Sequence, residues 1–147
     1  MMTKVAFICT GNSCRSQMAE GLARKLAHPE LEAFSARIAP VGVNPKTITV
    51  MKEIEIDISY HHSKNLGDIP DEIDYVVTVC ESAAKNCPNL RGKKETLHWP
   101  IPDPLLQGEE EKILNDFRRI RKMIQDKMIT FLRGRNLLET DHKAESS

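Results

Sequence analysis

The pattern of apolar and polar residues predicts short buried strands alternating with amphipathic helices, beginning at the N-terminus. Residues 4–8 are short and largely apolar, which is typical of a strand covered on both faces. A helix is predicted to follow, because Met18, Leu22 and Leu26 recur at helical spacing. Pro29 comes just beyond its expected end. The N-terminal part of the chain therefore predicts a strand, a tight loop and a helix.

The middle of the chain predicts a second helix and three further strands. The strands are expected over residues 32–41, 73–79 and 96–99. The helix is expected to begin at Pro45 with Asn44 as its N-cap, because Asn caps helices well and Pro suits the first helical position. Its apolar side is predicted to consist of Ile48, Met51 and Ile54. A polar loop should separate this helix from the third strand.

A long helix is predicted over residues 109–132. Apolar residues form a stripe along it at successive spacings of 4, 3, 4 and 4, namely Ile113, Phe117, Ile120, Ile124 and Met128. Acidic residues at its start and basic residues at its end have the charges that the helix dipole favours. Strands that alternate with helices predict an α/β layer structure with a mainly parallel sheet. Residues 1–135 are expected to form one catalytic domain, with 136–147 as a polar, flexible tail.

Charge and cysteine content narrow the class of protein. The 21 Lys and Arg residues balance 21 Asp and Glu residues, whereas nucleic-acid-binding domains normally have a basic excess. The apolar run that ends at Cys9 is too short to span a membrane. We therefore expect a monomeric cytoplasmic protein that binds neither nucleic acid nor membrane. In that compartment its 4 cysteines favour catalysis or metal binding over structural disulfides.

The anion loop, residues 9–16, has the composition of an oxyanion-binding site. Small residues and Gly11 allow backbone N–H groups to converge on an anion, and the following helix adds the amides of its N-terminus. Arg15 offers a planar fork to two oxygens. The same positive charges favour the thiolate of Cys9, which is then a nucleophile. The predicted oxyanion-binding residues are Thr10, Gly11, Asn12, Ser13, Cys14, Arg15 and Ser16.

Several of these residues also have simpler interpretations. Cys9 could be a small buried residue that ends a strand, because cysteines that form no disulfide are often buried. Asn12 could serve only the shape of the loop, since Asn tolerates left-handed backbone. Cys14 could line the pocket or protect Cys9 from oxidation by pairing with it. The succession of small residues, Arg15 and Ser16 after Cys9 favours the catalytic interpretation.

The anion loop resembles the phosphate-binding loop of the low-molecular-weight protein tyrosine phosphatase superfamily. Asp103 and Pro104 are similar to that family's general-acid segment, although Asp before Pro is also an ordinary turn residue. The resemblance extends from Lys4 to about Leu132. It implies a four-stranded parallel sheet with helices on both faces and the anion at the carboxyl edge of the strands. Asp103 would then be the general acid for the departing oxygen or would orient the attacking thiol.

A second pair of thiols distinguishes two chemistries within this superfamily. The redox segment, residues 80–88, contains Cys80 and Cys87 and is similar to that of thioredoxin-coupled arsenate reductases. The resemblance implies reduction of arsenate to arsenite through an adduct on Cys9. It also implies a thiol–disulfide relay through Cys9, Cys80 and Cys87 that thioredoxin regenerates, without metal or organic cofactor. Phosphate and sulfate would compete with arsenate. The alternative is a tyrosine phosphatase that uses Cys9, Arg15 and Asp103.

Two possible ion sites remain from the sequence. Some reductases of this branch bind potassium beside the anion loop, and Asn12, Glu20 and Ser35 match three of the positions that they use. At a further position of that site this chain has Lys64, unlike the potassium-binding reductases. We predict that the ammonium group of Lys64 pairs with Glu20 in place of the ion. The adjacent residues 61–62 are both His, but the spacing of the cysteines is unlike that of a zinc knuckle. No metal site is therefore predicted.

Overall fold

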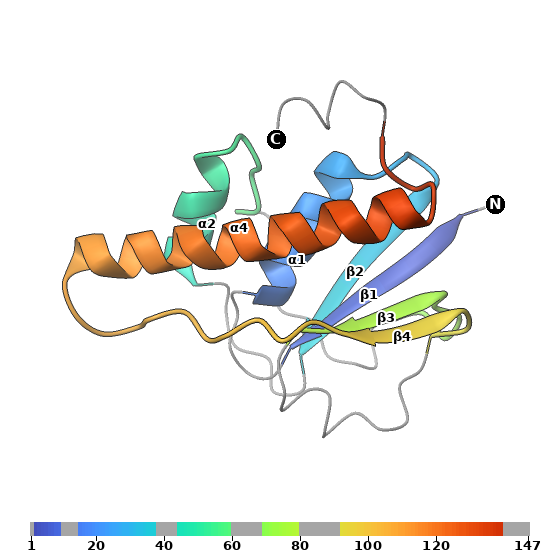
Figure 1. Ribbon diagram of the computed structural model, residues 1–147, viewed down its shortest axis with the longest axis horizontal. Helices are drawn as coiled ribbons and strands as arrows, with labels where there is room; N and C mark the ends of the chain where they lie inside the picture. The colour runs from blue at the N-terminus through green and yellow to red at the C-terminus, as the bar shows by residue number, and fades with distance from the viewer. Residues whose placement is uncertain (1, 10–14, 38–43, 60–68, 80–91, 140–147) are drawn as a thin grey trace.

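The computed structural model describes residues 2–9, 15–37, 44–59, 69–79 and 92–139, and its centre is a four-stranded sheet. The strands lie in the order β2-β1-β3-β4, and every neighbouring pair is parallel. They are β1 (Thr3–Cys9), β2 (Leu31–Arg37), β3 (Tyr75–Thr78) and β4 (Glu95–His98). The predicted parallel sheet is confirmed. Because the strands are parallel, all four carboxyl ends lie at the same edge (Figure 1).

The strand order creates a switch point beside β1. The chain moves from β1 to β2 on one side and then returns to β3 on the other. Ligands of open parallel sheets bind at such a point, outside the carboxyl ends of the strands. The N–H of Val79 donates to the carbonyl oxygen of Ile8 at 3.0 Å, so β1 and β3 remain together up to this edge. Consecutive residues of both strands are buried, which explains their unbroken apolar sequences.

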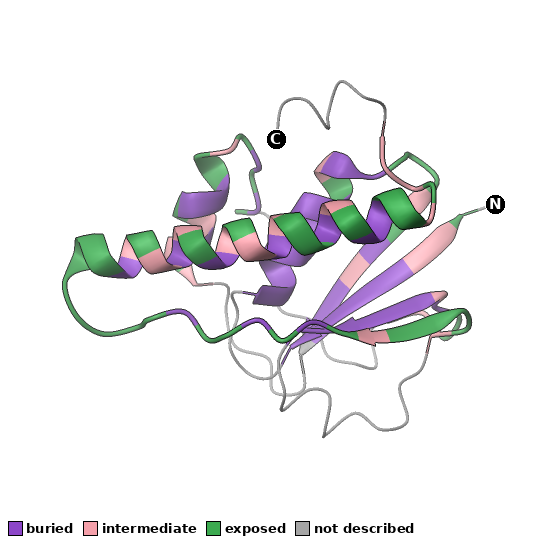
Figure 2. Ribbon diagram, in the orientation of Figure 1, coloured by how far each residue is buried: buried purple, intermediate pink, exposed green. Residues whose placement is uncertain are grey.

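Three helices of the described residues lie on the same side of the sheet in Figure 1. They are α1 (Arg15–Leu26), α2 (Pro45–Lys52) and α4 (Glu110–Gly134). Helix α1 packs against β1, β2 and α4, and α2 packs against α4. The predicted stripe of α4 is buried, and Phe131 and Leu132 extend it. Figure 2 shows buried and exposed positions alternating along this helix. Helices predicted for the opposite face fall outside the described residues.

The second helix is shorter than its apolar pattern predicted. Helix α2 ends at Lys52, and Ile54 lies in the turn that follows. In that turn Glu55 has a positive φ of 62°. Asn44 caps the helix as predicted, since its side chain accepts a hydrogen bond from the N–H of Lys46 at 2.9 Å. The N-cap and the proline therefore predicted where the helix begins, whereas the short apolar repeat did not predict where it ends.

The packed domain extends past the predicted boundary at residue 135 to Glu139. Helix α4 ends in a Schellman motif, with Asn136 in the left-handed region at φ 56° and the N–H of Leu137 bonded to the carbonyl oxygen of Leu132 at 2.8 Å. Leu138 then forms an antiparallel bridge with Ala27. The remainder of the predicted tail, residues 140–147, lies outside the described residues. Within the described ranges, no helix is both long and apolar enough to cross a membrane.

Candidate active site

Cys9 lies at the carboxyl edge of the sheet, where the sequence predicted the nucleophile. It is the last residue of β1 and is buried, and its backbone lies opposite that of Arg37 in β2. Helix α1 begins at Arg15, so the amides of its N-terminus belong to the same edge. The intervening residues of the anion loop lie outside the described part of the chain: Thr10, Gly11, Asn12, Ser13 and Cys14.

Arg15 joins the anion loop to a segment far along the sequence. Its side chain is only 6% exposed, and its NH1 group donates to the carbonyl oxygen of Ile101 at 2.8 Å. Its NH2 group forms an ion pair and hydrogen bond with Oδ1 of Asp103, whose side chain is 74% exposed. The fold thus brings together two predicted site residues that are 88 positions apart.

Two buried donors at the start of α1 lack a hydrogen-bond partner within the described part of the chain. They are Nε of Arg15 and the hydroxyl of Ser16. Leaving a buried polar group unsatisfied costs about 1–3 kcal/mol in general, and more for a charged group. A bound oxyanion or a thiolate would satisfy such donors, and both residues belong to the anion loop. The orphaned donors therefore suit the anion chemistry that the sequence predicted.

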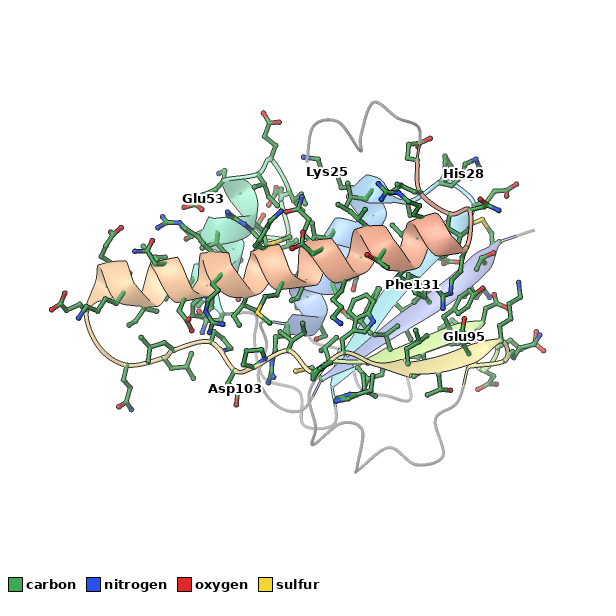
Figure 3. The ribbon with its side chains drawn as sticks, in the orientation of Figure 1. Lys25, His28, Glu53, Glu95, Asp103 and Phe131 are labelled. Carbon is green, nitrogen blue, oxygen red and sulfur yellow. The ribbon has the colours of Figure 1, made fainter. Side chains whose placement is uncertain are left out.

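The segment that carries Asp103 is here called the acid loop, residues 99–105, and it continues directly from β4. Trp99 is buried against Phe7 and Phe131, with ring centroids 5.9 and 6.0 Å away. The N–H of Trp99 also donates to the carbonyl oxygen of Thr78 at 2.8 Å. Buried aromatic packing thus fixes the beginning of the acid loop, while Asp103 itself extends into solvent near α4 (Figure 3).

Sequence reasoning missed one residue that contacts the acid loop. Oδ2 of Asp116, on α4, accepts a hydrogen bond from the N–H of Leu105 at 2.7 Å. Asp116 is also ion-paired with Arg119, three residues later on the helix. The sequence indicates that ion pair, because residues three apart on a helix are neighbours on its surface. The contact with Leu105 has no signal in the sequence, because it depends on how the loop lies against the helix.

Two members of the predicted cation or lysine site lie together. Oε1 of the buried Glu20 accepts a hydrogen bond from the hydroxyl of the buried Ser35. Arg24, one turn further along α1, lies 2.8 Å from the other carboxylate oxygen of Glu20. The sequence did not predict this Arg24 contact. Asn12 and Lys64 lie outside the described residues, so the nature of the cation stays a prediction.

The second thiol pair also lies outside the described residues, but the ends of its segment are placed. Val79, which precedes Cys80, is bonded to β1 at the carboxyl edge. Gly92 lies at the opposite edge, where a Cβ would be 2.7 Å from the carbonyl oxygen of Asp74. The connection that contains Cys80 and Cys87 therefore runs from one edge of the sheet to the other. No cluster of three potential metal ligands occurs within the described ranges.

A buried cysteine ends a central parallel strand, and an arginine begins the helix that follows, which is the arrangement predicted for a phosphatase-like oxyanion site. Residues 4–144 match the family described as low molecular weight phosphotyrosine protein phosphatase, and the chain belongs to this family. Its relatives include the arsenate reductase of Halalkalibacterium halodurans, 43% identical over 129 residues that cover 86% of this chain and 93% of that protein. Arsenate reductase 2 of Staphylococcus epidermidis is 45% identical over 129 residues, covering 86% and 94%.

Solved structures show the same likeness. An arsenate reductase in the oxidized state has a TM-score of 0.79 and 29% identity, covering 90% of this chain and 98% of that one. An arsenate reductase in the phosphate binding state has a TM-score of 0.69 and 28% identity, with the same coverage of 90% and 98%. A low molecular weight protein tyrosine phosphatase from T. tengcongensis, 22% identical with a TM-score of 0.72 over 90% of this chain and 99% of that one, shows the shared fold. The predicted family and fold class are confirmed.

Proposed function

We propose that this protein reduces arsenate to arsenite through an adduct on Cys9 and a relay of three thiols. The observation that carries the proposal is the hydrogen bond between Val79 and Ile8 at the carboxyl edge of the sheet. Cys9 and Cys80 are the next residues after this bonded pair, and consecutive Cα atoms are about 3.8 Å apart. The relatives named arsenate reductase support the choice of substrate.

Arsenate binding is assigned to the anion loop. The amides at the start of α1 and the guanidinium of Arg15 would hold the oxygens of the anion. In the structure Asp103 engages NH2 of Arg15, so its carboxylate occupies a position that suits an oxygen of the anion. Arrival of arsenate would release Asp103, which could then carry a proton to the departing oxygen. The relative in the phosphate binding state supports a tetrahedral oxyanion as the ligand.

The reaction balances as a two-electron transfer from sulfur to arsenic. The Cys9 thiolate attacks arsenic, and one oxygen leaves as water after Asp103 supplies a proton. The Cys80 thiolate then attacks the sulfur of Cys9, so an S–S bond forms, the S–As bond breaks, and its electron pair reduces As(V) to As(III). Cys87 next attacks Cys80, which releases the Cys9 thiolate and leaves a Cys80–Cys87 disulfide. An external dithiol, which we propose is thioredoxin, reduces that disulfide.

The setting of the enzyme belongs to the same proposal. A thiol relay that must be reduced in every cycle suits the cytoplasm, where thioredoxin keeps thiols reduced. We propose a monomer that needs no metal or organic cofactor. A lysine or potassium ion beside Glu20 and Ser35 would neutralise the buried carboxylate together with Arg24, and Lys64 is the proposed group.

Removal of either downstream thiol should abolish turnover while leaving a diagnostic intermediate. With NADPH, thioredoxin and thioredoxin reductase, C80S and C87S should each release arsenite at least about a hundredfold more slowly than the wild type, because no other thiol completes the relay. In single turnover C87S should release one arsenite and accumulate a Cys9–Cys80 disulfide, whereas C80S should release none. Arsenite release and mass-spectrometric mapping of disulfides measure both effects.

A matched control is S82A, which changes a polar side chain of the redox segment and leaves every thiol in place. It should turn over at the wild-type rate. Undiminished multiple turnover by C80S or by C87S would refute the relay.

A phosphatase is the second candidate, because the family and the Cys9, Arg15 and Asp103 set would serve phosphate ester hydrolysis equally well. The structure offers one observation against an aryl phosphate substrate. The residues after Asp103 and Pro104 are the exposed Leu105 and Leu106, and neither provides an aromatic ring to stack on a phenyl group. Aryl phosphate hydrolysis with arsenate left unchanged and all thiols reduced would establish the phosphatase instead.

A further inference from the structure

We infer that Asp116 is a positioning residue that holds the acid loop, and with it Asp103, in place for proton transfer. The inference rests on the proposed use of Asp103 as the general acid. Asp116 lies in the N-terminal part of α4, and its side chain is 20% exposed. Its Oδ2 accepts the N–H of Leu105 at 2.7 Å. Leu105 follows Asp103 by only two residues, so this contact holds the backbone beside the acid.

Arg119 fixes the direction in which Asp116 points. Its Nε donates to Oδ1 of Asp116 at 2.9 Å, and its NH2 group lies 2.8 Å from the same oxygen. The two carboxylate oxygens are therefore divided between two tasks. One is bound by the guanidinium of the same helix, and the other is directed at the acid loop. Charge-assisted hydrogen bonds of this kind are stronger and more directional than neutral ones.

Polar contacts hold the acid loop on both sides of Asp103. On the N-terminal side, Arg15 donates to the carbonyl oxygen of Ile101 at 2.8 Å. On the C-terminal side, Asp116 accepts from Leu105. Arg15 also holds Asp103 directly, but that contact must be given up when Arg15 binds an oxyanion. During the reaction the position of Asp103 would then depend on the backbone contacts of the loop, which include the bond of Trp99 to Thr78 at its start. Of the two contacts at Ile101 and Leu105, each two residues from Asp103, the one with Asp116 is independent of the anion-binding arginine.

Apolar packing holds the end of the acid loop at the buried Pro104 but not at the residues that follow it. Leu105 and Leu106 are 43% and 55% exposed. A hollow of about 460 Å³ lies between the loop and α4, lined by Asp103, Leu105, Lys112, Asn115, Asp116 and Arg119. A loop beside an open hollow has room to move once its hydrogen bond is lost. Asp116 therefore adds a polar restraint at Leu105, directly after the buried Pro104.

The expected kinetic effect is on the chemical step and not on binding. A general acid contributes about 10²- to 10⁴-fold to the rate, and a displacement of about 1 Å can cost a hundredfold. D116A should therefore lower kcat by about tenfold to a hundredfold. KM should change by less than about threefold, because ground-state binding uses Arg15 and the amides of α1.

A double-mutant cycle with Asp103 tests whether Asp116 acts through the acid. The proteins are the wild type, D116A, D103N and D103N/D116A, each assayed for arsenate turnover and for hydrolysis of phenyl phosphate. If Asp116 acts through Asp103, D116A should lower kcat by about tenfold to a hundredfold when Asp103 is present. In the D103N background it should change kcat by less than about twofold.

Two further variants serve as controls. D116N keeps an oxygen for the N–H of Leu105, so its kcat should remain within about threefold of that of the wild type. D126A is the matched control, since Asp126 lies on the same helix and is ion-paired with Lys122 at 3.1 Å.

Three outcomes would overturn the inference: no loss in D116A, an equal loss in the D103N background, or a loss confined to KM. If D116A fails to fold, R119M replaces it in the double-mutant cycle. R119M removes the ion pair that orients Asp116 but keeps the carboxylate that accepts from the N–H of Leu105. R119M should then lose activity only when Asp103 is present. If the wild type hydrolyses phenyl phosphate but reduces no arsenate, the proposed function is refuted and the inference is not. The kcat values for phenyl phosphate hydrolysis in the double-mutant cycle then test the inference. Arsenate reduction that D116A leaves unaffected refutes the inference alone.

Discussion

At the scale of single residues, Arg15 shows how a buried charge is prepared for an anion. A buried guanidinium needs partners, and the acid loop supplies a carbonyl oxygen and a carboxylate. Its Nε has no partner in the described residues, so the cation keeps capacity for an oxyanion. The exposed Asp103 is a replaceable partner because it can return to water when the anion arrives. The resting ion pair and the proposed catalysis therefore use the same two groups in succession.

Gly92 is the position where the backbone leaves no room for a side chain, and its replacement should be severe. A Cβ would lie 2.0 Å from the carbonyl oxygen of Glu95 and 2.9 Å from the backbone nitrogen of Val76. These are backbone atoms that cannot move aside without disturbing β3 and β4. G92A should lower the free energy of unfolding by at least about 1–3 kcal/mol, as overpacking generally does. Denaturant unfolding measures the change.

Gly134 provides the control for that substitution. It ends α4, and nothing lies within 4 Å of the Cβ that alanine would add. G134A should be neutral or stabilise the protein by up to about 1 kcal/mol, because alanine is the better helix former. Equal unfolding free energies for G92A and G134A would show that the steric argument is wrong.

At the scale of elements, helix α4 connects the core, a second helix and the acid loop. Its apolar stripe enters the core, and Asp116 anchors the acid loop. On another side, Arg118 binds the carboxylate of Glu53 through Nε and NH2 at 3.0 and 2.7 Å. Arg121 adds a bond to Glu53 at 2.8 Å and another to the carbonyl oxygen of Val50 at 2.6 Å. Two arginines of α4 thus hold the end of α2.

The Glu53 cluster should make stability depend on pH in the acid range. Hydrogen bonding from Arg118, followed by Arg121, lowers the pKa of Glu53 below its ordinary value of 4.5 despite some desolvation. A carboxylate with a lowered pKa stabilises the fold above its unfolded pKa, and this stabilisation is lost as pH falls through the folded pKa. At neutral pH the wild type should therefore have a higher melting temperature than E53Q. The difference should be modest, because the ion pair is partly exposed. The difference should shrink as pH falls below 4.5.

Thermal melts of both proteins between about pH 7 and pH 3 measure this difference. E32Q, which alters an exposed glutamate of β2, is the control and should follow the wild-type curve. Parallel melting curves for the wild type and E53Q down to the lowest pH would contradict the assignment.

At the scale of the whole molecule, the sheet gathers the chemistry at one edge while the C-terminal segment closes the opposite region. After α4 the chain passes beside the end of α1. The N–H of His28 donates to the carbonyl oxygen of Leu137 at 2.7 Å, and the N–H of Glu139 donates to that of Leu26 at 2.8 Å. Leu137 and Leu138 also pack partly buried against the core. This segment therefore secures both α1 and α4 far from Cys9.

Shortening the chain should distinguish this segment from the residues beyond it. A chain ending at residue 135 should lose about 2–4 kcal/mol of unfolding free energy, because it lacks two partly buried leucines and the backbone hydrogen bonds of residues 136–139, including those to Leu26 and His28. A chain ending at residue 139 is the control and should unfold like the full chain. Urea midpoints compare all three proteins. If both shortened chains unfold at the same concentration, residues 136–139 contribute nothing to stability.

The sequence by itself determined the types of element and predicted the chemistry of the site. Periodic apolar residues predicted the four strands and the stripe of α4, because such patterns follow from local backbone geometry. The anion loop was recognisable because oxyanion chemistry requires particular residue types at short spacing, and Asp103 because residues 103–104 resemble the family's general-acid segment. The tertiary structure decided which distant groups meet, including Arg15 with Asp103, Asp116 with Leu105, and Arg24 with Glu20 and Ser35. It also decided that residues up to Glu139 belong to the packed domain. Those contacts depend on the relative placement of whole elements, which packing of the common core sets and no local pattern encodes.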